Sequence, residues 1–163
     1  MLYVDLRDLG RGPVQTNATL APTDPLFEGL GLDLVGPVAV EGRLQPAGDA
    51  EYLWRGRIQA SVAAACRRCL TDVQQSIDAG VDVLFSSDPD AEDDPSVYPL
   101  PQDATQVDVG QAVREELALA AELFALCRED CAGLCPKCGA DLNAGACNCA
   151  ASAEPVRGHH GGT

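Results

Sequence analysis

The residues of this chain best suited to chemistry are its eight cysteines, which fall into four closely spaced pairs. Two thiolates presented by one turn of backbone can bind the same metal ion, and a second pair completes a tetrahedral site. Because no cysteine is left over, the pattern indicates two sites of four thiolates each. The pairs are Cys66 and Cys69, Cys127 and Cys131, Cys135 and Cys138, and Cys147 and Cys149.

The loops between the pairs decide which pairs meet. Only eight residues, GADLNAGA, separate Cys138 from Cys147, and so short a loop of small and turn-forming residues closes at low cost. The segment AGL between Cys131 and Cys135 is too short for the chain to turn round and present two pairs to one ion. We therefore expect two zinc ions, one held by Cys66, Cys69, Cys127 and Cys131 and the other by Cys135, Cys138, Cys147 and Cys149.

Other uses of paired cysteines fit the sequence less well. A thioredoxin-like motif needs one CxxC that opens a helix after a strand, whereas CRRC at 66–69 lies between two expected strands. A redox-sensitive zinc protein or chaperone, which releases its metal on oxidation, is an alternative. Catalytic zinc needs an open coordination position and a general base, but all eight thiols are used and Glu129 is the only His or Glu within the knuckles. We therefore expect a protein that is not an enzyme.

Composition and charge describe a small acidic protein. Of its 163 residues, 46 % are hydrophobic but only 4 % are aromatic, so the core is built mainly from Val, Leu and Ala. Eleven Lys and Arg against 25 Asp and Glu give a net charge of −14, which repels phosphates at long range and attracts basic partners. No apolar run reaches the roughly 20 residues of a membrane helix, and no secretion signal opens the chain. We expect a cytoplasmic protein with no membrane partner and no small-molecule substrate.

Four segments of alternating apolar and polar residues are expected to form strands. A slip in the alternation predicts a bulge at Gly56, and the Gly-, Pro- and Asp-rich residues 10–34 predict a long loop with a short helix near 25–30. Short strands joined by tight turns indicate an antiparallel sheet or an open barrel. The expected strands cover 2–6, 37–45, 51–66 and 73–87, the last as one strand or a strand pair.

One long helix is expected to cover this sheet. Within residues 107–126, Val113 and Leu117 share an apolar face at helical spacing, and Asp108 precedes them as a cap. About 18 residues would make a helix of about 27 Å. The predicted fold class is α+β, with an antiparallel sheet or open barrel of short strands packed by one long helix and a C-terminal zinc-knuckle module.

The expected domain organisation follows from the shifts in composition. The acidic, proline-containing segment before the helix is typical of a solvated linker, and the polar, glycine-rich end of the chain is typical of disorder. The expected boundaries are 1–126 for the α+β core domain with an acidic linker inserted at 86–106, 127–149 for the zinc module and 150–163 for the tail.

Three stretches of the chain carry a specific resemblance. They are CRRCL at 66–70, VDVGQAVREELAL at 107–119 and CREDCAGLCPKCGADLNAGACNC at 127–149. With these motifs, of which GLCPxCGxxLN followed by CxC is the most specific, the chain resembles the YceD family, the large ribosomal RNA subunit accumulation proteins. The resemblance spans about 2–149 and implies a role in the synthesis, processing or stability of 23S rRNA. Many relatives continue after CxC with Asp-Pro-Arg and a short apolar helix, of which this chain keeps only Pro155 and Arg157.

Two routes to such a role are open. In the first, a local patch of arginines touches rRNA phosphates within a Debye length of about 8–10 Å, although ordinary surface arginines would look the same. In the second, the acidic protein binds a basic large-subunit ribosomal protein or a pre-ribosomal particle and acts on rRNA through it, and the net charge favours this route. The candidate RNA contacts are Arg43, Arg55, Arg57, Arg67 and Arg68.

Overall fold

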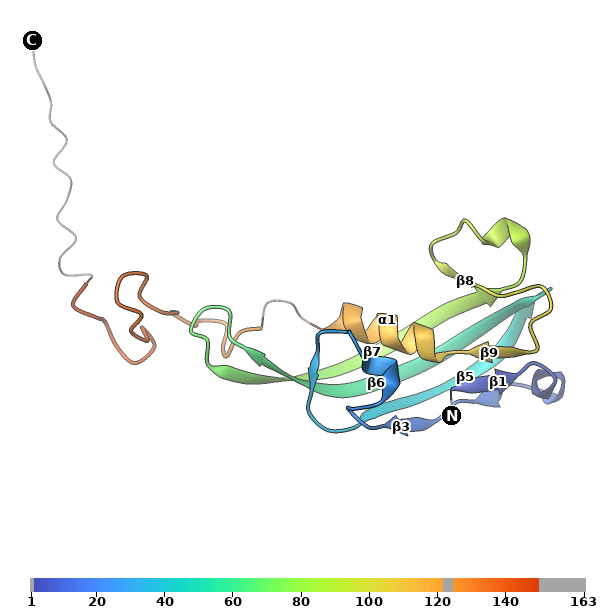
Figure 1. Ribbon diagram of the computed structural model, residues 1–163, viewed down its shortest axis with the longest axis horizontal. Coiled ribbons are helices and arrows are strands. Elements are labelled where there is room, and N and C mark those ends of the chain that lie inside the picture. Colours follow the sequence, from blue (N-terminus) through green and yellow to red (C-terminus); the bar gives the residue numbers. More distant parts are fainter. Residues whose placement is uncertain (1, 122–124, 150–163) are drawn as a thin grey trace, which may run out of the picture. The chain divides into compact units, whose positions relative to one another are not determined.

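Strands β5 (Val38–Gly48) and β6 (Glu51–Ala65) form a long antiparallel pair at the centre of the fold (Figure 1). Along β6, alternate residues from Trp54 to Val62 face the core, while Arg55 and Arg57 between them are exposed. β7 (Asp72–Ser86) is the next strand of the same sheet. The period of two that the sequence shows in these segments therefore matches one buried and one exposed face.

Short strands complete the sheet on both sides. β2 and β3 pair antiparallel with β5, β4 pairs antiparallel with β6, and β8 runs parallel to β7, so that the seven-stranded sheet is mixed. A separate antiparallel pair, β1 with β9, brings the beginning of the chain beside the segment that precedes the helix. Their bounds are β1 (Tyr3–Asp5), β2 (Val14–Gln15), β3 (Ala18–Leu20), β4 (Asp33–Leu34), β8 (Val97–Pro99) and β9 (Gln106–Asp108).

Helix α1 (Gly110–Ala120) packs on this sheet and closes one core with it (Figure 1). Val113 and Leu117 from the helix and Trp54 and Ile58 from β6 are fully buried in the same cluster. The fold class expected from the sequence, an α+β arrangement of a largely antiparallel sheet packed by one helix, is confirmed, with the parallel β8 as an addition.

The computed structural model describes residues 2–121 and 125–149, and the chain divides into two compact units. The sheet unit consists of Met1–Ala63 and Gln74–Leu123, and the cysteine unit of Ala64–Val73 and Phe124–Thr163. All eight cysteines belong to the cysteine unit. Within the described residues, no helix is both long and apolar enough to span a membrane.

The bulge predicted at Gly56 is wrong. Gly56 pairs directly with Gly42 of β5, and the register of this pair of strands shifts only between Pro46 and Gly48. The alternation is interrupted at Gly56 because the indole of Trp54 occupies the space that a side chain at this position would fill. A Cβ added to Gly56 would lie 2.5 Å from Trp54 Cζ2. A glycine on the buried face therefore makes room for a large ring without disturbing the ladder.

The helix is shorter than predicted. α1 contains 11 residues, and Ala121 after it has extended backbone, whereas the expected residues 122–124 lie outside the described residues. Asp108 accepts a 2.8 Å hydrogen bond from the backbone N–H of Gly110, so it caps the first turn from one position before the N-cap residue Val109.

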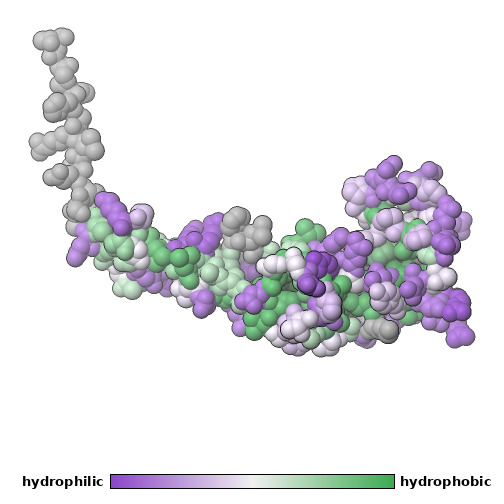
Figure 2. Space-filling view, in the orientation of Figure 1, coloured by the Kyte–Doolittle hydropathy of each residue, from purple (hydrophilic) through white to green (hydrophobic). Residues whose placement is uncertain are grey.

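Segments expected to be irregular contain short elements. Residues 10–34 hold β2, β3 and β4, and the helix expected near 25–30 is the 3-10 turn η2 (Pro25–Phe27). The acidic segment 86–106 contains the 3-10 turn η3 (Pro89–Ala91) and β8. Figure 2 shows hydrophilic residues gathered over the loop that carries η3.

Candidate metal centres

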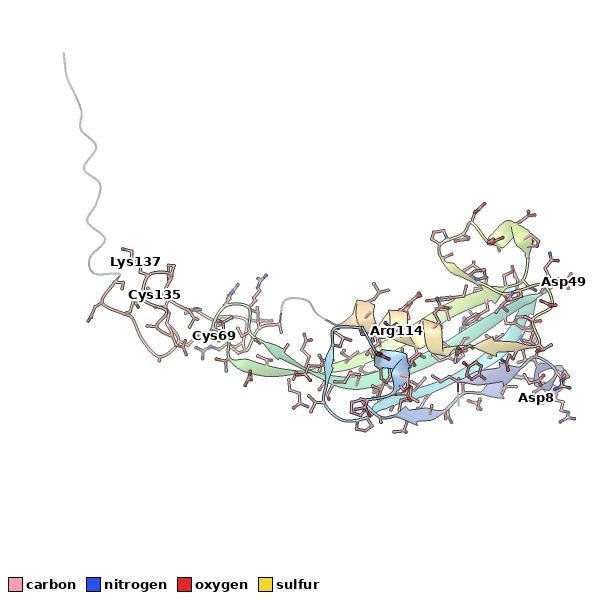
Figure 3. The ribbon with its side chains drawn as sticks, viewed as in Figure 1. Asp8, Asp49, Cys69, Arg114, Cys135 and Lys137 are labelled. Atoms are coloured by element: carbon pink, nitrogen blue, oxygen red, sulfur yellow. The ribbon has the colours of Figure 1, made fainter. Side chains whose placement is uncertain are left out.

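Two segments far apart in sequence bring four sulfur atoms together in the cysteine unit. Figure 3 labels one cysteine of each group, Cys69 and Cys135. The Sγ atoms of this first group, Cys66, Cys69, Cys127 and Cys131, all lie within 4.8 Å of one another. Cys66 Sγ lies 3.7 Å from Cys131 Sγ, and Cys69 Sγ lies 3.6 Å from Cys127 Sγ. Four sulfurs bound to zinc at about 2.3 Å would be separated by about 3.8 Å, whereas a disulfide is about 2.05 Å long. The spacing therefore fits a tetrahedral tetrathiolate site.

The first group is built on a tight turn after β6. The backbone N–H of Cys66 donates to the carbonyl of Thr71, and the N–H of Leu70 donates to the carbonyl of Cys66, both at 2.8 Å. Leu70 has a φ of 61°, in the left-handed region of backbone conformation that residues other than glycine rarely adopt. The turn points Cys66 and Cys69 the same way and buries both.

The second group repeats this turn with different residues. The backbone N–H of Cys135 donates to the carbonyl of Ala140, and the backbone N–H of Gly139 donates to the carbonyl of Cys135, both at 2.8 Å. Gly139 has a φ of 74° at the position equivalent to Leu70, where glycine adopts the left-handed conformation without strain. The Sγ atoms of Cys135, Cys138, Cys147 and Cys149 lie within 4.8 Å of one another.

The two groups differ in burial. In the first group only Cys127 is exposed, and the other three are buried. In the second group only Cys135 is buried, while Cys138 is exposed and the last two are half-buried. Two groups of four cysteines could thus hold metal ions, the first more shielded from water than the second.

In each group, a backbone N–H lowers the pKa of one thiol, which favours the thiolate form that binds a metal. The N–H of Cys69 is the main cause that lowers the pKa of the Cys66 thiol to about 6, and the N–H of Cys138 does the same for Cys135, also to about 6. The Cys138 thiol, hydrogen-bonded to Cys149, raises the pKa of Cys149 to about 12. Metal binding requires deprotonated thiols, so a bound divalent cation would displace such shared protons and offset part of the negative charge of the four thiolates.

Asn143 contacts the first group although the spacing of the cysteines does not predict it. It lies in the loop between Cys138 and Cys147, and its Nδ2 donates to Cys131 Sγ at 3.3 Å. This bond is the main cause that lowers the pKa of the Cys131 thiol. The motif GADLN at 139–143 is the only sequence signal that places a polar amide here. A hollow of about 410 Å³ beside it is lined by Cys69, Thr71, Cys127, Arg128, Asp141, Asn143 and Ala144.

The five arginines named as candidate RNA contacts are divided between the units. On the exposed face of the sheet, Arg57 makes two hydrogen bonds with Asp78, and Arg55 lies 3.5 Å from Asp82. Arg43 is exposed and faces Arg55 across the strands. In the cysteine unit, Arg68 donates to the carbonyls of Glu129 and Cys131 and so braces the first group, and Arg67 is exposed.

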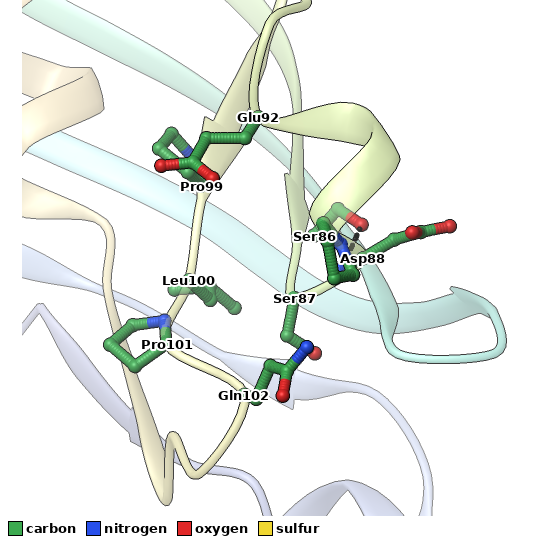
Figure 4. Close-up of a pocket in the computed structure, with 9 residues that line it drawn as sticks. Ser86, Ser87, Asp88, Glu92, Pro99, Leu100, Pro101 and Gln102 are labelled. Atoms are coloured by element: carbon green, nitrogen blue, oxygen red, sulfur yellow. Dashed lines mark hydrogen bonds between the residues drawn. The ribbon is translucent and has the colours of Figure 1, made fainter.

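A further hollow lies in the sheet unit, where β7 ends near the segment after β8 (Figure 4). It has a volume of about 470 Å³, and Asp88 and Glu92 are among the residues that line it. The backbone N–H of Asp88 donates to the hydroxyl of Ser86, which is buried. Pro99 and Pro101 line it as well.

Residues 54–157 match the family model of the large ribosomal RNA subunit accumulation protein YceD. This match covers more than half of the chain, including all eight cysteines and the helix, and the chain belongs to the YceD family. The family name implies a role in the accumulation of large-subunit ribosomal RNA.

The chain is also similar to mycobacterial proteins named as uncharacterized. It is 29 % identical over 148 residues to one from Mycobacterium leprae, covering 85 % of this chain and 66 % of the relative. It is 27 % identical over 148 residues to one from Mycobacterium bovis, covering 86 % of this chain and 70 % of the relative. No solved structure matches the chain.

Proposed function

We propose that this protein is a non-enzymatic zinc-binding factor in large ribosomal subunit biogenesis, acting in the cytoplasm on the synthesis, processing or stability of 23S rRNA. The observation that carries the proposal is the pair of four-sulfur clusters within a chain of the YceD family. Each cluster supplies all four ligands of a tetrahedral zinc ion, which leaves no coordination position for a substrate.

The zinc ions would stabilise the folded structure of the cysteine unit. The first group would join Ala64–Val73 to the segment that begins at residue 125, and the described part of this unit has only a small buried cluster, which the cysteines themselves make up. Structural zinc sites contribute about 10 kcal/mol or more of apparent binding free energy to folding. Metal analysis of the purified chain should give two zinc ions per molecule. One ion or none would contradict the proposal.

A basic protein is the partner that the charge distribution favours. The sheet unit has six arginines and twenty carboxylates, a net charge of −14, whereas the cysteine unit has five basic and five acidic residues. Arg55 and Arg57 are partly neutralised by Asp82 and Asp78. A large-subunit ribosomal protein or a pre-ribosomal particle would therefore meet an acidic surface, and rRNA would be affected through it.

Affinity purification at two salt concentrations, with RNase added to half of each sample, tests this partner. Capture of large-subunit proteins should survive RNase and weaken at the higher salt concentration. Recovery that depends on intact RNA would support direct rRNA binding instead. Recovery of neither, together with normal precursor rRNA in a deletion strain, would contradict the ribosomal role.

Paired charge variants make this test sharper. Replacing Asp90, Glu92 and Asp93 with Asn or Gln removes exposed negative charge beside η3 and should reduce capture. The control variant Arg55→Gln with Arg57→Gln makes the sheet unit more acidic and should not reduce capture of a basic partner. The opposite pattern would favour the direct RNA route.

A further inference from the structure

The loop that closes the second cysteine group is folded onto the first group. Leu142 N–H donates to the carbonyl of Gly133 at 2.9 Å, and Leu134 forms a β-bridge with Asp141. Leu134 N–H in turn donates to the carbonyl of Arg68, beside the first pair of cysteines. The backbone of the loop therefore runs directly against the segment that follows Cys131.

This packing of the loop places the side chain of Asn143 against the first cysteine group. Its Oδ1 accepts hydrogen bonds from the backbone N–H of Ala132 at 2.8 Å and from Arg128 Nη2 at 2.7 Å. Its Nδ2 donates to Asp141 Oδ1 at 2.9 Å and to Cys131 Sγ at 3.3 Å. Two donors on one side and two acceptors on the other determine the orientation of the amide. An aspartate would place a negative oxygen against the sulfur instead.

A hydrogen bond of this kind acts on the metal through its ligand. Zinc with four thiolates carries a net charge of about −2 by the ligand chemistry, so an N–H donor that takes up part of the charge on sulfur stabilises the loaded site. Partners of this kind, which touch a ligand and not the metal, typically change metal affinity about 10- to 100-fold. Here the partner belongs to the loop between two ligands of the other site.

We propose that Asn143 couples the two metal sites, so that an occupied second site holds the loop 139–146 in place and its amide strengthens metal binding at the first. This inference rests on the proposed zinc binding. Because such coupling is a property of the equilibrium, occupation of the first site strengthens the second by the same factor. Each site would therefore keep its metal more firmly while the other site is occupied.

Cadmium NMR of the full chain tests the coupling, since each loaded site should give its own resonance. Asn143→Ala should shift the resonance of the first site and weaken its metal binding about 10- to 100-fold, and Asn143→Asp should weaken it further. Asn148→Ala, at an exposed asparagine between two ligands of the second site, is the matched control and should leave the first site unchanged.

A variant that leaves Asn143 intact completes the test. Cys147→Ser with Cys149→Ser empties the second site and should weaken the first site as much as Asn143→Ala does. Adding Asn143→Ala to it should then have little further effect. Unchanged first-site affinity in the serine variant, or full additivity of the two changes, would overturn the coupling. A wild-type chain that takes up no metal would instead overturn the proposed zinc binding.

Discussion

Thr16 and Trp54 are joined by a buried hydrogen bond, in which Trp54 Nε1 donates to Thr16 Oγ1 at 2.7 Å. Both side chains are almost completely inaccessible to water. Thr16 lies between β2 and β3, and its backbone N–H donates to the carbonyl of Gly42 at 2.8 Å. The bond therefore attaches the two short outer strands to the centre of the sheet.

Thr16→Val should destabilise the sheet unit by about 1–3 kcal/mol, because it keeps the shape of the side chain but leaves the indole N–H buried without a partner. Urea unfolding followed by the fluorescence of the single tryptophan measures this change. Thr19→Val, at an exposed position of β3, is the matched control and should change stability little. Equal losses in the two variants would show that the buried bond is not the cause.

Gly56→Ala should also destabilise the protein, because its Cβ would lie 2.5 Å from Trp54 Cζ2. Overpacking of a well-filled core typically costs about 1–3 kcal/mol. Gly80→Ala, in β7 where nothing lies within 4 Å of the new Cβ, should be neutral or slightly stabilising. Thermal unfolding of the two variants would contradict the account if Gly56→Ala melted no earlier than Gly80→Ala.

The long strands could be predicted from the sequence, whereas the short ones could not. β5, β6 and β7 each show a repeated alternation because each covers the core over many residues. β2 and β4 contain two residues each, too few for any period, and their partner strands hold them in place. The bulge at Gly56 was wrongly predicted for a similar reason. The space left by the missing side chain of Gly56 is filled by the ring of Trp54, two positions away, and this contact cannot be read from the alternation alone.

The candidate metal groups depend on both spacing and contacts. Cysteine spacing and loop length are enough to indicate which pairs can meet, because a short loop limits the distances that the chain can reach. The contact from Asn143 to Cys131 depends on how one loop docks on another, which spacing does not determine. Likewise, the acidic partners of Arg55 and Arg57 come from β7, a neighbour known only once the sheet order is known.

Tyr98 should ionise at a higher pH than an ordinary tyrosine. Burial is the first cause that raises its pKa, and its hydroxyl also donates to Glu115 Oε2 at 2.7 Å. Since the folded pKa lies above the ordinary value of 10.0, this group contributes stability that is complete below pH 10 and is lost as the pH rises further. Alkaline absorbance titration of the wild type and of Tyr98→Phe should identify its late step.

Glu115→Gln provides the control for this assignment. Removing the carboxylate should lower the pKa of Tyr98, yet burial should keep that pKa above the ordinary value. The ring also packs against Phe85 of β7, with centroids 5.2 Å apart, so the titration reports whether β8 stays on the sheet. A tyrosine that titrates normally in the wild type would mean that this part of the acidic segment is detached.

Cys69→Ser should cost more stability than Cys149→Ser. Cys69 and Cys127 of the first group lie 58 positions apart, whereas only eight residues separate Cys138 from Cys147 in the second. Closing the longer loop removes more entropy from the unfolded chain. Calorimetric unfolding of both zinc-loaded variants, with zinc content measured in parallel, tests this order. Comparable losses would contradict the separate roles of the two groups.

The division of charge between the units has a consequence for how the protein responds to its surroundings. Mutual repulsion among the carboxylates of the sheet unit falls as ionic strength rises, so salt should stabilise that part of the molecule. With zinc bound as proposed, the two cysteine groups would depend instead on free zinc and on oxidants. Zinc starvation would then unfold the cysteine unit while the sheet unit stays folded. The two units would therefore respond to different conditions in the cell, the sheet unit to ionic strength and the cysteine unit to zinc and oxidants.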